Sequence, residues 1–585
     1  MASTLSWLHP TWAFALPIAL SFPIGWLMWR SLDLPDDRKG RGLDALPMFL
    51  CRLIGRSSPT KMDWKRYAVA MLAFNAALFV LSFALLFFQD KIPFLNPDAK
   101  GSLAALGYKD TAGVQHDGVD TAVIFNTVCS FVTNTNLQHY SGEQNLSYFS
   151  QLAAIVWLMF VTPAAGLCVM LATLRGLRGD KDLGDFYVDL MRGLVFVLIP
   201  YTFILGVTLV GLGVPMTFEG AAKATTIDGA ATKMETQSIA RGPVAALVAI
   251  KQAGTNGGGF FGPNSAHPFE NPSPWTNLLS IVSIVMLPMA SIVMAGHMLK
   301  NKKHAIVIYG VMLTFLFFGV VIAIVAEVQP SVATRGLPVV EGPNMEGKEV
   351  RLGPVAAATW ASMTTATSNG SVNSMHDSLN PIAGAVPMTM MMLNVVFSGI
   401  GAGFENMLMY IIVAVFIAGL MVGRTPEYLG KKVEAKEVKL AMVAILLHPL
   451  LICGGAALFA ATDWGAKTTA NPGSHGFSEI LYEFTSAAAN NGSGFEGLAD
   501  NNPAWNIATG IVLLLGRFPA LILPLAVAGF LSAKKHVPQT SGTLRTDNMT
   551  FAGMLLGTVL LVGALSFMPA VVLGPIADHL SSMKP

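Results

Sequence analysis

Residues 133–136 read TNTN, and similar polar runs recur as GTNGGGFF at 254–261, TSNGSV at 367–372 and NNGSGF at 490–495. Each run follows a short apolar segment, at 121–131, 243–252, 355–365 and 477–488. A helix of about 11 residues is only half as long as a membrane crossing requires. The sequence therefore predicts four helices that enter a membrane and return as irregular chain.

The composition is that of a membrane protein. Of 585 residues, 53% are hydrophobic and 12% are charged, far from the balance of a soluble domain. The formal net charge of +2 gives no sign of a nucleic-acid partner. The cysteines are Cys51, Cys129, Cys168 and Cys453. Their spacing matches neither a metal site nor a disulfide framework, so we expect small buried hydrophobes.

Ten apolar runs are long enough to cross about 30 Å of hydrocarbon. They lie at 12–29, 68–88, 150–174, 191–213, 277–299, 305–326, 382–421, 440–460, 503–531 and 551–573. The first run does not fit a signal peptide, because its basic residues follow the apolar core instead of preceding it. These basic residues are Arg30, Arg38, Lys39 and Arg41. We therefore expect an uncleaved first span.

Lysine and arginine gather in every second connection between these runs. The clusters lie at 30–66, at Arg175, Arg178 and Lys181, at Lys300, Lys302 and Lys303, at Arg424, Lys431, Lys432 and Lys436, and at Lys534 and Lys535. Basic loops face the cytoplasm, which places both termini outside it. The remaining connections are longer, and each contains one of the four polar runs.

The order of span, short helix, polar run and span occurs four times. We expect repeats at 68–175, 191–299, 305–421 and 440–532, preceded by a first span with its basic loop at 1–67 and followed by a last span and outer C-terminus at 551–585. Irregular backbone at membrane depth is tolerated only where it lines a watery cavity. The sequence thus predicts an all-α polytopic protein in which four pseudo-symmetric repeats surround one pore.

The residue types in the polar runs suit a dehydrated monovalent cation. Rings of backbone carbonyls can replace its hydration water. We expect the unusual dihedrals that aim carbonyls together at Gly257, Gly258, Gly259, Gly370 and Gly492. Hydroxyls come from Thr133, Thr255, Ser368 and Ser493, and bracing amides from Asn134, Asn256, Asn369 and Asn491. No acidic residue lies in the runs, which disfavours a divalent ion.

Two features are predicted below the polar runs. The apolar run 382–421 is twice the needed length and is interrupted at Gly399, Gly401 and Gly403, which we interpret as a gate or constriction. Two helices meeting at a surface turn are the alternative. Arg517 lies midway along an apolar span and should face the interior. It is either a barrier to cations or an anchor that pairs with Glu405 or with backbone carbonyls.

Several long motifs resemble those of one known family. They are FVTNTN (131–136), QHYSGE (138–143), GTNGGGFF (254–261), NSAHPFENP (264–272), EVQ (327–329), NMEGKE (344–349), SMHDS (374–378), GLMVGRTPEYLGKK (419–432), NPGSHGFSE (471–479), NNGSGF (490–495) and GTVLLVGALSF (557–567). Together they are similar to the channel-like A subunits of the Kdp potassium-transporting P-type ATPases of bacteria and archaea. The resemblance runs from Trp64 to the last span.

The resemblance implies the fold of the potassium channel and transporter superfamily and a potassium filter. Its positions would be Thr133, Asn134, Thr135 and Asn136, then Gly254, Thr255, Asn256, Gly257 and Gly258, then Ser368, Asn369 and Gly370, and finally Asn491, Gly492 and Ser493. Leu137 and Asn369 differ from the residues that are common at these positions in the family. These differences could change the affinity of the filter for potassium or its discrimination among ions.

The resemblance also implies partners and a location. A P-type ATPase subunit would receive potassium through an intramembrane tunnel, and a small single-span subunit and a very small membrane peptide would complete the complex in a bacterial inner membrane. No cofactor is expected, and potassium is the transported ligand.

Other functions fit the sequence less well. The chain has neither an Asp-Lys-Thr-Gly phosphorylation motif nor a P-loop, so we expect a non-catalytic subunit. A potassium channel or an ion-coupled potassium transporter would share the four repeats. A membrane enzyme would need a catalytic or metal cluster, and His139, His267, His376 and His475 have no ligand spacing along the chain.

Overall fold

The computed structural model describes residues 2–35, 40–56, 59–110, 113–229, 234–334, 337–338, 342–423, 425–537 and 544–583. Arg38, Lys39 and Arg424, which belong to the predicted basic clusters, lie outside these residues.

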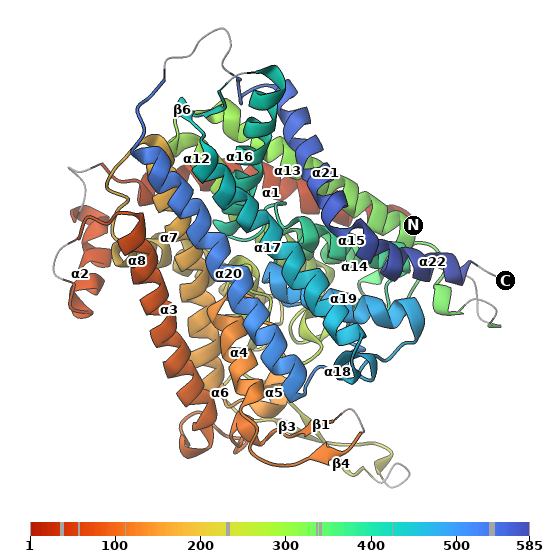
Figure 1. Cartoon of the computed structure of the whole chain (residues 1–585). Coiled ribbons are helices and arrows are strands. Elements are labelled where there is room, and N and C mark those ends of the chain that lie inside the picture. The colour runs from red at the N-terminus through yellow and green to blue at the C-terminus, as the bar shows by residue number, and fades with distance from the viewer. Residues whose placement is uncertain are drawn as a thin grey trace.

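The described chain is mostly helical (Figure 1). The α-helices are α1 (Ala2–Leu32), α2 (Ala45–Leu53), α3 (Trp64–Phe87), α4 (Ala122–Val132), α5 (Gly142–Asn145), α6 (Tyr148–Ser150), α7 (Trp157–Arg178), α8 (Phe186–Gly193), α9 (Ile199–Gly211), α11 (Val244–Ala253), α12 (Pro274–Met298), α13 (Lys302–Glu327), α14 (Gly353–Ala366), α15 (Pro381–Leu393), α16 (Ala402–Val422), α17 (Ala435–Ala460), α18 (Asp463–Ala466), α19 (Gly473–Ala489), α20 (Pro503–Ser532), α21 (Met549–Val571) and α22 (Ala577–Ser582).

Shorter elements join or decorate these helices. π-Helical turns η4 (Gln151–Val156), η5 (Leu194–Leu198) and η8 (Val572–Ile576) connect neighbouring α-helices into continuous rods. Single 3₁₀ turns are η1 (Gly42–Asp44), η2 (Gln89–Lys91), η3 (Leu103–Ala105), η6 (Asn264–Ala266) and η7 (Val332–Thr334). The antiparallel pairs are β1 (Tyr108–Lys109) with β2 (Gln115–His116), β3 (Ala222–Thr225) with β4 (Thr236–Ile239), and β5 (Glu427–Tyr428) with β6 (Lys431–Lys432).

The prediction of ten membrane spans is confirmed for the described part of the chain. The long apolar helices cover Leu8–Leu32, Trp64–Phe87, Tyr148–Arg178, Phe186–Gly211, Pro274–Met298, Lys302–Thr334, Ala402–Met421, Ala435–Ala460, Pro503–Ser532 and Met549–Ser582. Each is long enough to cross the hydrocarbon core at 1.5 Å per residue. The protein is therefore a polytopic helical membrane protein.

The four short helices predicted from the sequence are α4, α11, α14 and α19. Each packs on the span before it, which is α3, α9, α13 and α17 respectively. Helices α14 and α19 begin at Gly353 and Gly473, earlier than their apolar runs suggested, because α14 starts with a Gly-Pro pair and α19 with the polar turn GSHG.

Helix α20 joins the last repeat to the first. It packs along α19 and α17 of its own repeat and also along α4 and α7 (Figure 1). The N-terminal helix α1 packs along α12, and α21 lies against α13 and α16. The four repeats thus form a closed arrangement, with one further helix added by each end of the chain.

The two kinds of connection lie at opposite ends of the molecule. Strands β1, β3 and β4 belong to connections that precede polar runs, and Figure 1 shows them together at the lower end. Strand β6 belongs to a basic connection and lies at the upper end. This separation is the one expected for alternating loops of a membrane protein.

Candidate functional site

All four short helices end in the same backbone conformation. The residue after the last helical turn is left-handed at Asn134, Thr255, Ser368 and Asn490, with φ of 65°, 53°, 49° and 54°. The next amide nitrogen then donates to the carbonyl five residues earlier, at N···O distances of 2.9, 3.1, 2.8 and 2.9 Å for Thr135, Asn256, Asn369 and Asn491. This is a Schellman cap, repeated four times.

The caps fix which residues are equivalent. Asn134, Thr255, Ser368 and Asn490 form one layer, Thr135, Asn256, Asn369 and Asn491 the next, and Asn136, Gly257, Gly370 and Gly492 the third. Residues of one type therefore fall in different layers: Asn134 is equivalent to Thr255, whereas Asn256 is equivalent to Thr135. Asn490, which was not among the predicted filter residues, belongs to the first layer.

The four loops are hydrogen-bonded into a closed ring in chain order. Asn134 Nδ2 donates to Gly254 O at 3.2 Å, and Gly370 N donates to Asn256 O at 3.2 Å. The third and fourth loops are joined by Asn491 Nδ2 and Asn369 O at 3.0 Å. Asn490 Nδ2 and Thr135 Oγ1, 3.1 Å apart, close the ring from the fourth loop to the first. The asparagines therefore brace the loops, as predicted.

Glycine is required at positions in this ring for two different physical reasons. Gly257 and Gly492 are left-handed, with φ of 98° and 102°, as predicted for strained backbone. Gly258, Gly259 and Gly370 are not left-handed, so the dihedral explanation is wrong for them. They are needed because chains approach closely: a Cβ on Gly370 would lie 2.6 Å from Asn491 O.

Many carbonyl oxygens of the ring remain free of protein hydrogen bonds. In the first layer, the carbonyls of Asn134, Ser368 and Asn490 accept none from the residues that the structure describes. In the third layer the same holds for Asn136, Gly370 and Gly492, while Gly257 O accepts from Asn264 Nδ2 at 2.7 Å. Buried carbonyls require a partner. A desolvated cation would supply it.

The polar side chains of the loops are buried. Thr133 Oγ1 donates to Cys129 O at 2.8 Å and lies 2.8 Å from Thr135 Oγ1, so it braces its own loop. Ser493 Oγ is 2.8 Å from Tyr482 Oη and donates to Asn491 Oδ1. Both amide atoms of Asn136 lack a partner within the described structure although the side chain is buried. Asn136 is thus another available ligand.

A buried ion pair supports the second loop from behind. Lys251 and Glu270 are in contact, and both side chains are fully buried. Glu270 accepts hydrogen bonds from Phe260 N at 2.7 Å and Phe261 N at 3.0 Å. Protein donors therefore occupy the carboxylate of Glu270, which lies behind the loop. The four polar runs contain no acidic residue of their own.

A small cavity lies directly beneath the ring. It measures about 20 Å³, and its lining includes Asn134, Ser368 and Asn490 of the first layer together with Gly399 and Arg517. Space of this size holds about one water-sized sphere. The predicted interior position of Arg517 is correct. Arg517 has no hydrogen bond or ion pair to any described residue, and both oxygens of Glu405 are unpaired too, so the proposed pairing between them does not form.

The predicted interruption between α15 and α16 is present and begins earlier than expected. Asn394, Phe397, Gly399 and Gly401 are left-handed, whereas Gly403 is already helical. Ser398 Oγ donates to Ala366 O of α14 at 3.2 Å. The segment is buried, so a surface turn is wrong. A side chain on Gly401 would collide with Gly166 O of α7.

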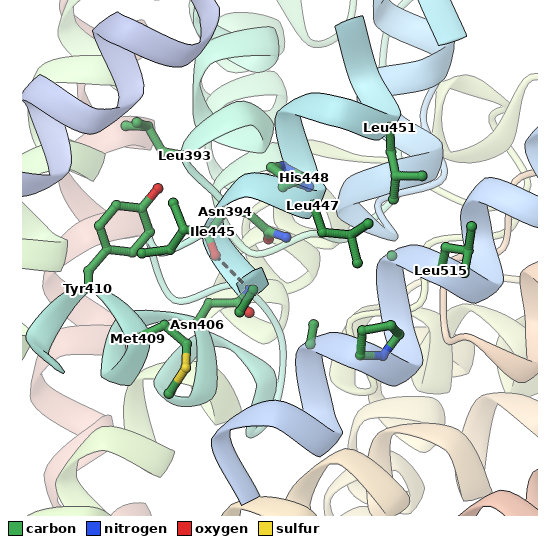
Figure 2. A pocket seen from close by; sticks show the side chains of 14 residues that line it. Leu393, Asn394, Asn406, Met409, Tyr410, Ile445, Leu447, His448, Leu451 and Leu515 are labelled. Carbon is green, nitrogen blue, oxygen red and sulfur yellow. Dashed lines mark hydrogen bonds between the residues drawn. The ribbon is translucent and has the colours of Figure 1, made fainter. Parts of the chain in front are cut away.

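A second cavity continues sideways from the first (Figure 2). It measures about 50 Å³ and lies among α16, α17 and α20. Asn394, Asn406, Gly516 and Ala520 line both cavities. Asn406 Nδ2 donates to Asn394 O at 2.9 Å, and His448 lies at the upper edge in Figure 2. The space beneath the ring therefore extends toward the side of the helix bundle.

Comparison with known proteins agrees with this arrangement. A family model described as potassium-transporting ATPase A subunit matches residues 11–580. The potassium-transporting ATPase potassium-binding subunit of Geobacillus kaustophilus (strain HTA426) is 46% identical over 576 residues, which is 98% of both chains. This chain belongs to the potassium-transporting ATPase A subunit family.

Sequence reasoning missed three parts of this A subunit. The lateral cavity forms where α20 packs beside α16 and α17, and His448 carried no motif. Asn490 was not among the filter positions carried over from the resemblance, although it belongs to the first layer of the ring. The third part is a cluster around His139 that contains Glu483 and Asp500. Histidine spacing could not reveal it, because the partners are 344 and more residues away.

Proposed function

We propose that this A subunit binds potassium from outside the cytoplasm in the ring of four loops and delivers it sideways, through the membrane, to a P-type ATPase subunit. That partner hydrolyses ATP. A small single-span subunit and a very small membrane peptide complete the pump.

The observation that carries this proposal is the pair of carbonyl layers. In each of two layers, three of four backbone oxygens have no hydrogen-bond donor among the described residues. Uncharged oxygens in a ring suit a large monovalent cation, whereas divalent ions usually require carboxylates. The name of the relative, a potassium-binding subunit, supports potassium as that cation.

The route away from the filter follows from the two cavities. A cation that leaves the ring enters the cavity beneath it, where Arg517 repels it from the straight path. The cavity beside Asn406 and Ala520 offers the alternative direction. Active transport needs such a diversion, because a continuous pore would dissipate the gradient.

Potassium-stimulated ATP hydrolysis by the complex, co-purified from its native membrane, tests the proposal. Gly370→Asp should weaken the apparent potassium affinity at least tenfold and blunt discrimination against sodium, because the side chain enters the ring. Gly211→Asp is the control. Gly211 is exposed at the end of α9 with no atom near its Cβ position, so this change should leave affinity unaltered.

Unchanged affinity and selectivity in a correctly assembled Gly370→Asp complex would show that the ring is not the filter. Potassium conductance by the A subunit alone, without an ATPase partner, would instead favour a channel or an ion-coupled transporter.

A further inference from the structure

Three ionisable side chains meet at the outer rim of the ring, where the first and fourth repeats join. His139 follows the first polar run, Glu483 lies on α19, and Asp500 precedes α20. His139 Nε2 is 3.3 Å from Glu483 Oε1 and 3.7 Å from Asp500 Oδ2. The side chains of His139 and Glu483 are buried, while that of Asp500 is 29% exposed. The cluster is thus enclosed but reachable from solvent.

The neighbouring amide fixes the tautomer of the imidazole. Asn506 Nδ2 donates to Asn501 Oδ1 at 3.3 Å, which turns Asn506 Oδ1 toward His139 Nδ1 at 2.8 Å. Nδ1 must therefore donate its proton to Asn506. Nε2 then faces both carboxylates. A hydrogen bond from one ring nitrogen to an oxygen, with the other nitrogen directed at carboxylates, is the arrangement around metal-ligating histidines.

The distances fit ligands that share a metal better than they fit hydrogen bonds. A strong charge-assisted N···O hydrogen bond measures about 2.7–2.9 Å. Ligands bound tetrahedrally at about 2.0–2.2 Å are separated from one another by about 3.3–3.6 Å. The two separations at His139 lie at or just beyond this second range.

A second histidine cluster in the same chain, around His475, is held by ordinary hydrogen bonds instead. His475 Nδ1 is 2.9 Å from Asp578 Oδ2, and its Nε2 is 3.0 Å from Asp377 Oδ1. Both ring nitrogens are at ordinary hydrogen-bond distance from a carboxylate. His475 is therefore an imidazolium that holds two carboxylates and offers no free lone pair to a metal.

The charge of the His139 cluster also calls for a cation. Glu483 is buried, and the 3.3 Å contact with His139 is the one polar side-chain contact that its carboxylate makes among the described residues. A buried carboxylate is costly unless a positive charge accompanies it. A metal ion bound between the three side chains would place a positive charge beside both carboxylates.

We propose that His139, Glu483 and Asp500 bind a divalent transition-metal ion of the zinc class, with water at the fourth position beside the exposed face of Asp500. Imidazole with two carboxylates is a ligand set that such ions accept. The ion joins the loop after the first polar run to the helix and loop of the fourth repeat. This site does not depend on the identity of the ion in the filter.

Cobalt(II) as the added metal provides the test, because a four-coordinate site gives it an intense visible absorption. The full-length protein in its purified complex is first stripped with a chelator. We expect one Co²⁺ per chain and displacement of its absorption by Zn²⁺. A folded wild-type complex that binds no Co²⁺ at one equivalent overturns the proposal.

Three variants localise the metal. Asp500→Asn and His139→Gln should each weaken Co²⁺ binding at least tenfold, whereas His475→Gln should retain it. Asp500 is partly exposed, so its variant decides the outcome if His139→Gln does not fold. Equal binding by wild type and Asp500→Asn, or loss of binding in His475→Gln instead, overturns the assignment. Potassium-stimulated ATP hydrolysis, measured in parallel, reports separately on the filter.

Discussion

At the scale of single residues, the ring depends on backbone that most side chains avoid. Thr255 is β-branched and left-handed, a conformation that costs about 1–2 kcal/mol. Ser368 is held there by a 3.0 Å contact between its Oγ and Asn394 Oδ1, which also ties the ring to the break below. Strain of this kind persists only where the surroundings enforce it. The hydrogen-bonded ring provides that enforcement.

Gly492→Ala should damage the ring specifically. Gly492 is left-handed, and a Cβ there would collide with Thr135 O of the first loop. We expect at least a tenfold loss of apparent potassium affinity and about 2 kcal/mol lower stability. Gly454→Ala in α17 is the matched control, because no atom lies near its Cβ position. It should change stability by less than about 1 kcal/mol. Equal effects of the two variants on transport would contradict this account.

Arg517→Gln tests the barrier beneath the ring. At an effective dielectric of about 20, a cation about 6 Å from the guanidinium is repelled by on the order of 3 kcal/mol. The glutamine variant should pass potassium down its gradient without ATP, as measured by flux into vesicles. Arg517→Lys keeps the charge and should remain tight. Tight vesicles and normal ATP coupling in Arg517→Gln would leave only a structural role for the arginine.

At the scale of elements, the break between α15 and α16 opens the side of the bundle. The backbone there crosses beneath the ring instead of continuing as a helix, and α16 resumes at Ala402. The space beside it is lined by α17 and α20 (Figure 2). An unbroken span at this place would close the lateral cavity.

Ala520→Phe should block that cavity. Ala520 lines both the space beneath the ring and the lateral space, so a benzyl group at this position would project into the passage between them. We expect loss of potassium-stimulated ATP hydrolysis, while binding of thallium(I), used as a potassium analogue, is retained. Ile511→Phe changes an exposed position of the same helix and should remain active. Full activity of the Ala520→Phe complex would place the route elsewhere.

His475 holds the C-terminal helix α22 in place through its contact with Asp578. Burial acts to lower the pKa of His475, but hydrogen bonds to Asp377 and Asp578 outweigh it and raise that pKa to about 10. Because the folded pKa is raised, the stabilisation is complete below about pH 6.5 and declines as pH rises toward 10.

Thermal unfolding at several pH values checks this contribution. Wild type should exceed His475→Gln by about 2 kcal/mol near pH 6, and the difference should shrink toward pH 10. A difference that is constant between pH 6 and pH 10 would show that the ion pairs do not fasten the helix.

At the scale of the whole molecule, the protein is a ring of four repeats that must close on itself. Helix α20 makes the closure by packing on α4 and α7, and Asn490 and the His139 cluster add polar contacts at the same junction. The other three junctions lie between repeats adjacent in the chain. The junction between first and last repeats is the one that covalent continuity does not support.

The purified A subunit alone should not hydrolyse ATP. Its sequence contains neither a phosphorylation motif nor a P-loop, so phosphoryl transfer must be supplied by another chain. Hydrolysis should appear only when the ATPase subunit is added back, and only with potassium present. Robust potassium-stimulated hydrolysis by the A subunit alone, free of co-purifying ATPase, would refute this prediction.

The sequence by itself determined the spans, the four short helices and the interruption near Gly399. These depend on local properties: a run of apolar residues must match the membrane thickness, and glycine marks backbone that cannot continue as a helix. The motifs that identified the family are contiguous stretches for a related reason. They form loops whose conformation is set by residues that are close together in the sequence.

Only the tertiary structure decided the register of the loops, the free carbonyls, the lateral cavity and the meeting of His139 with Glu483. Asn134 is equivalent to Thr255 because of backbone caps, which residue types do not reveal. His139 and Glu483 are 344 residues apart and meet because the fourth repeat closes on the first. Such contacts arise from packing between whole helices, and no local pattern of residues encodes which distant side chains that packing brings together.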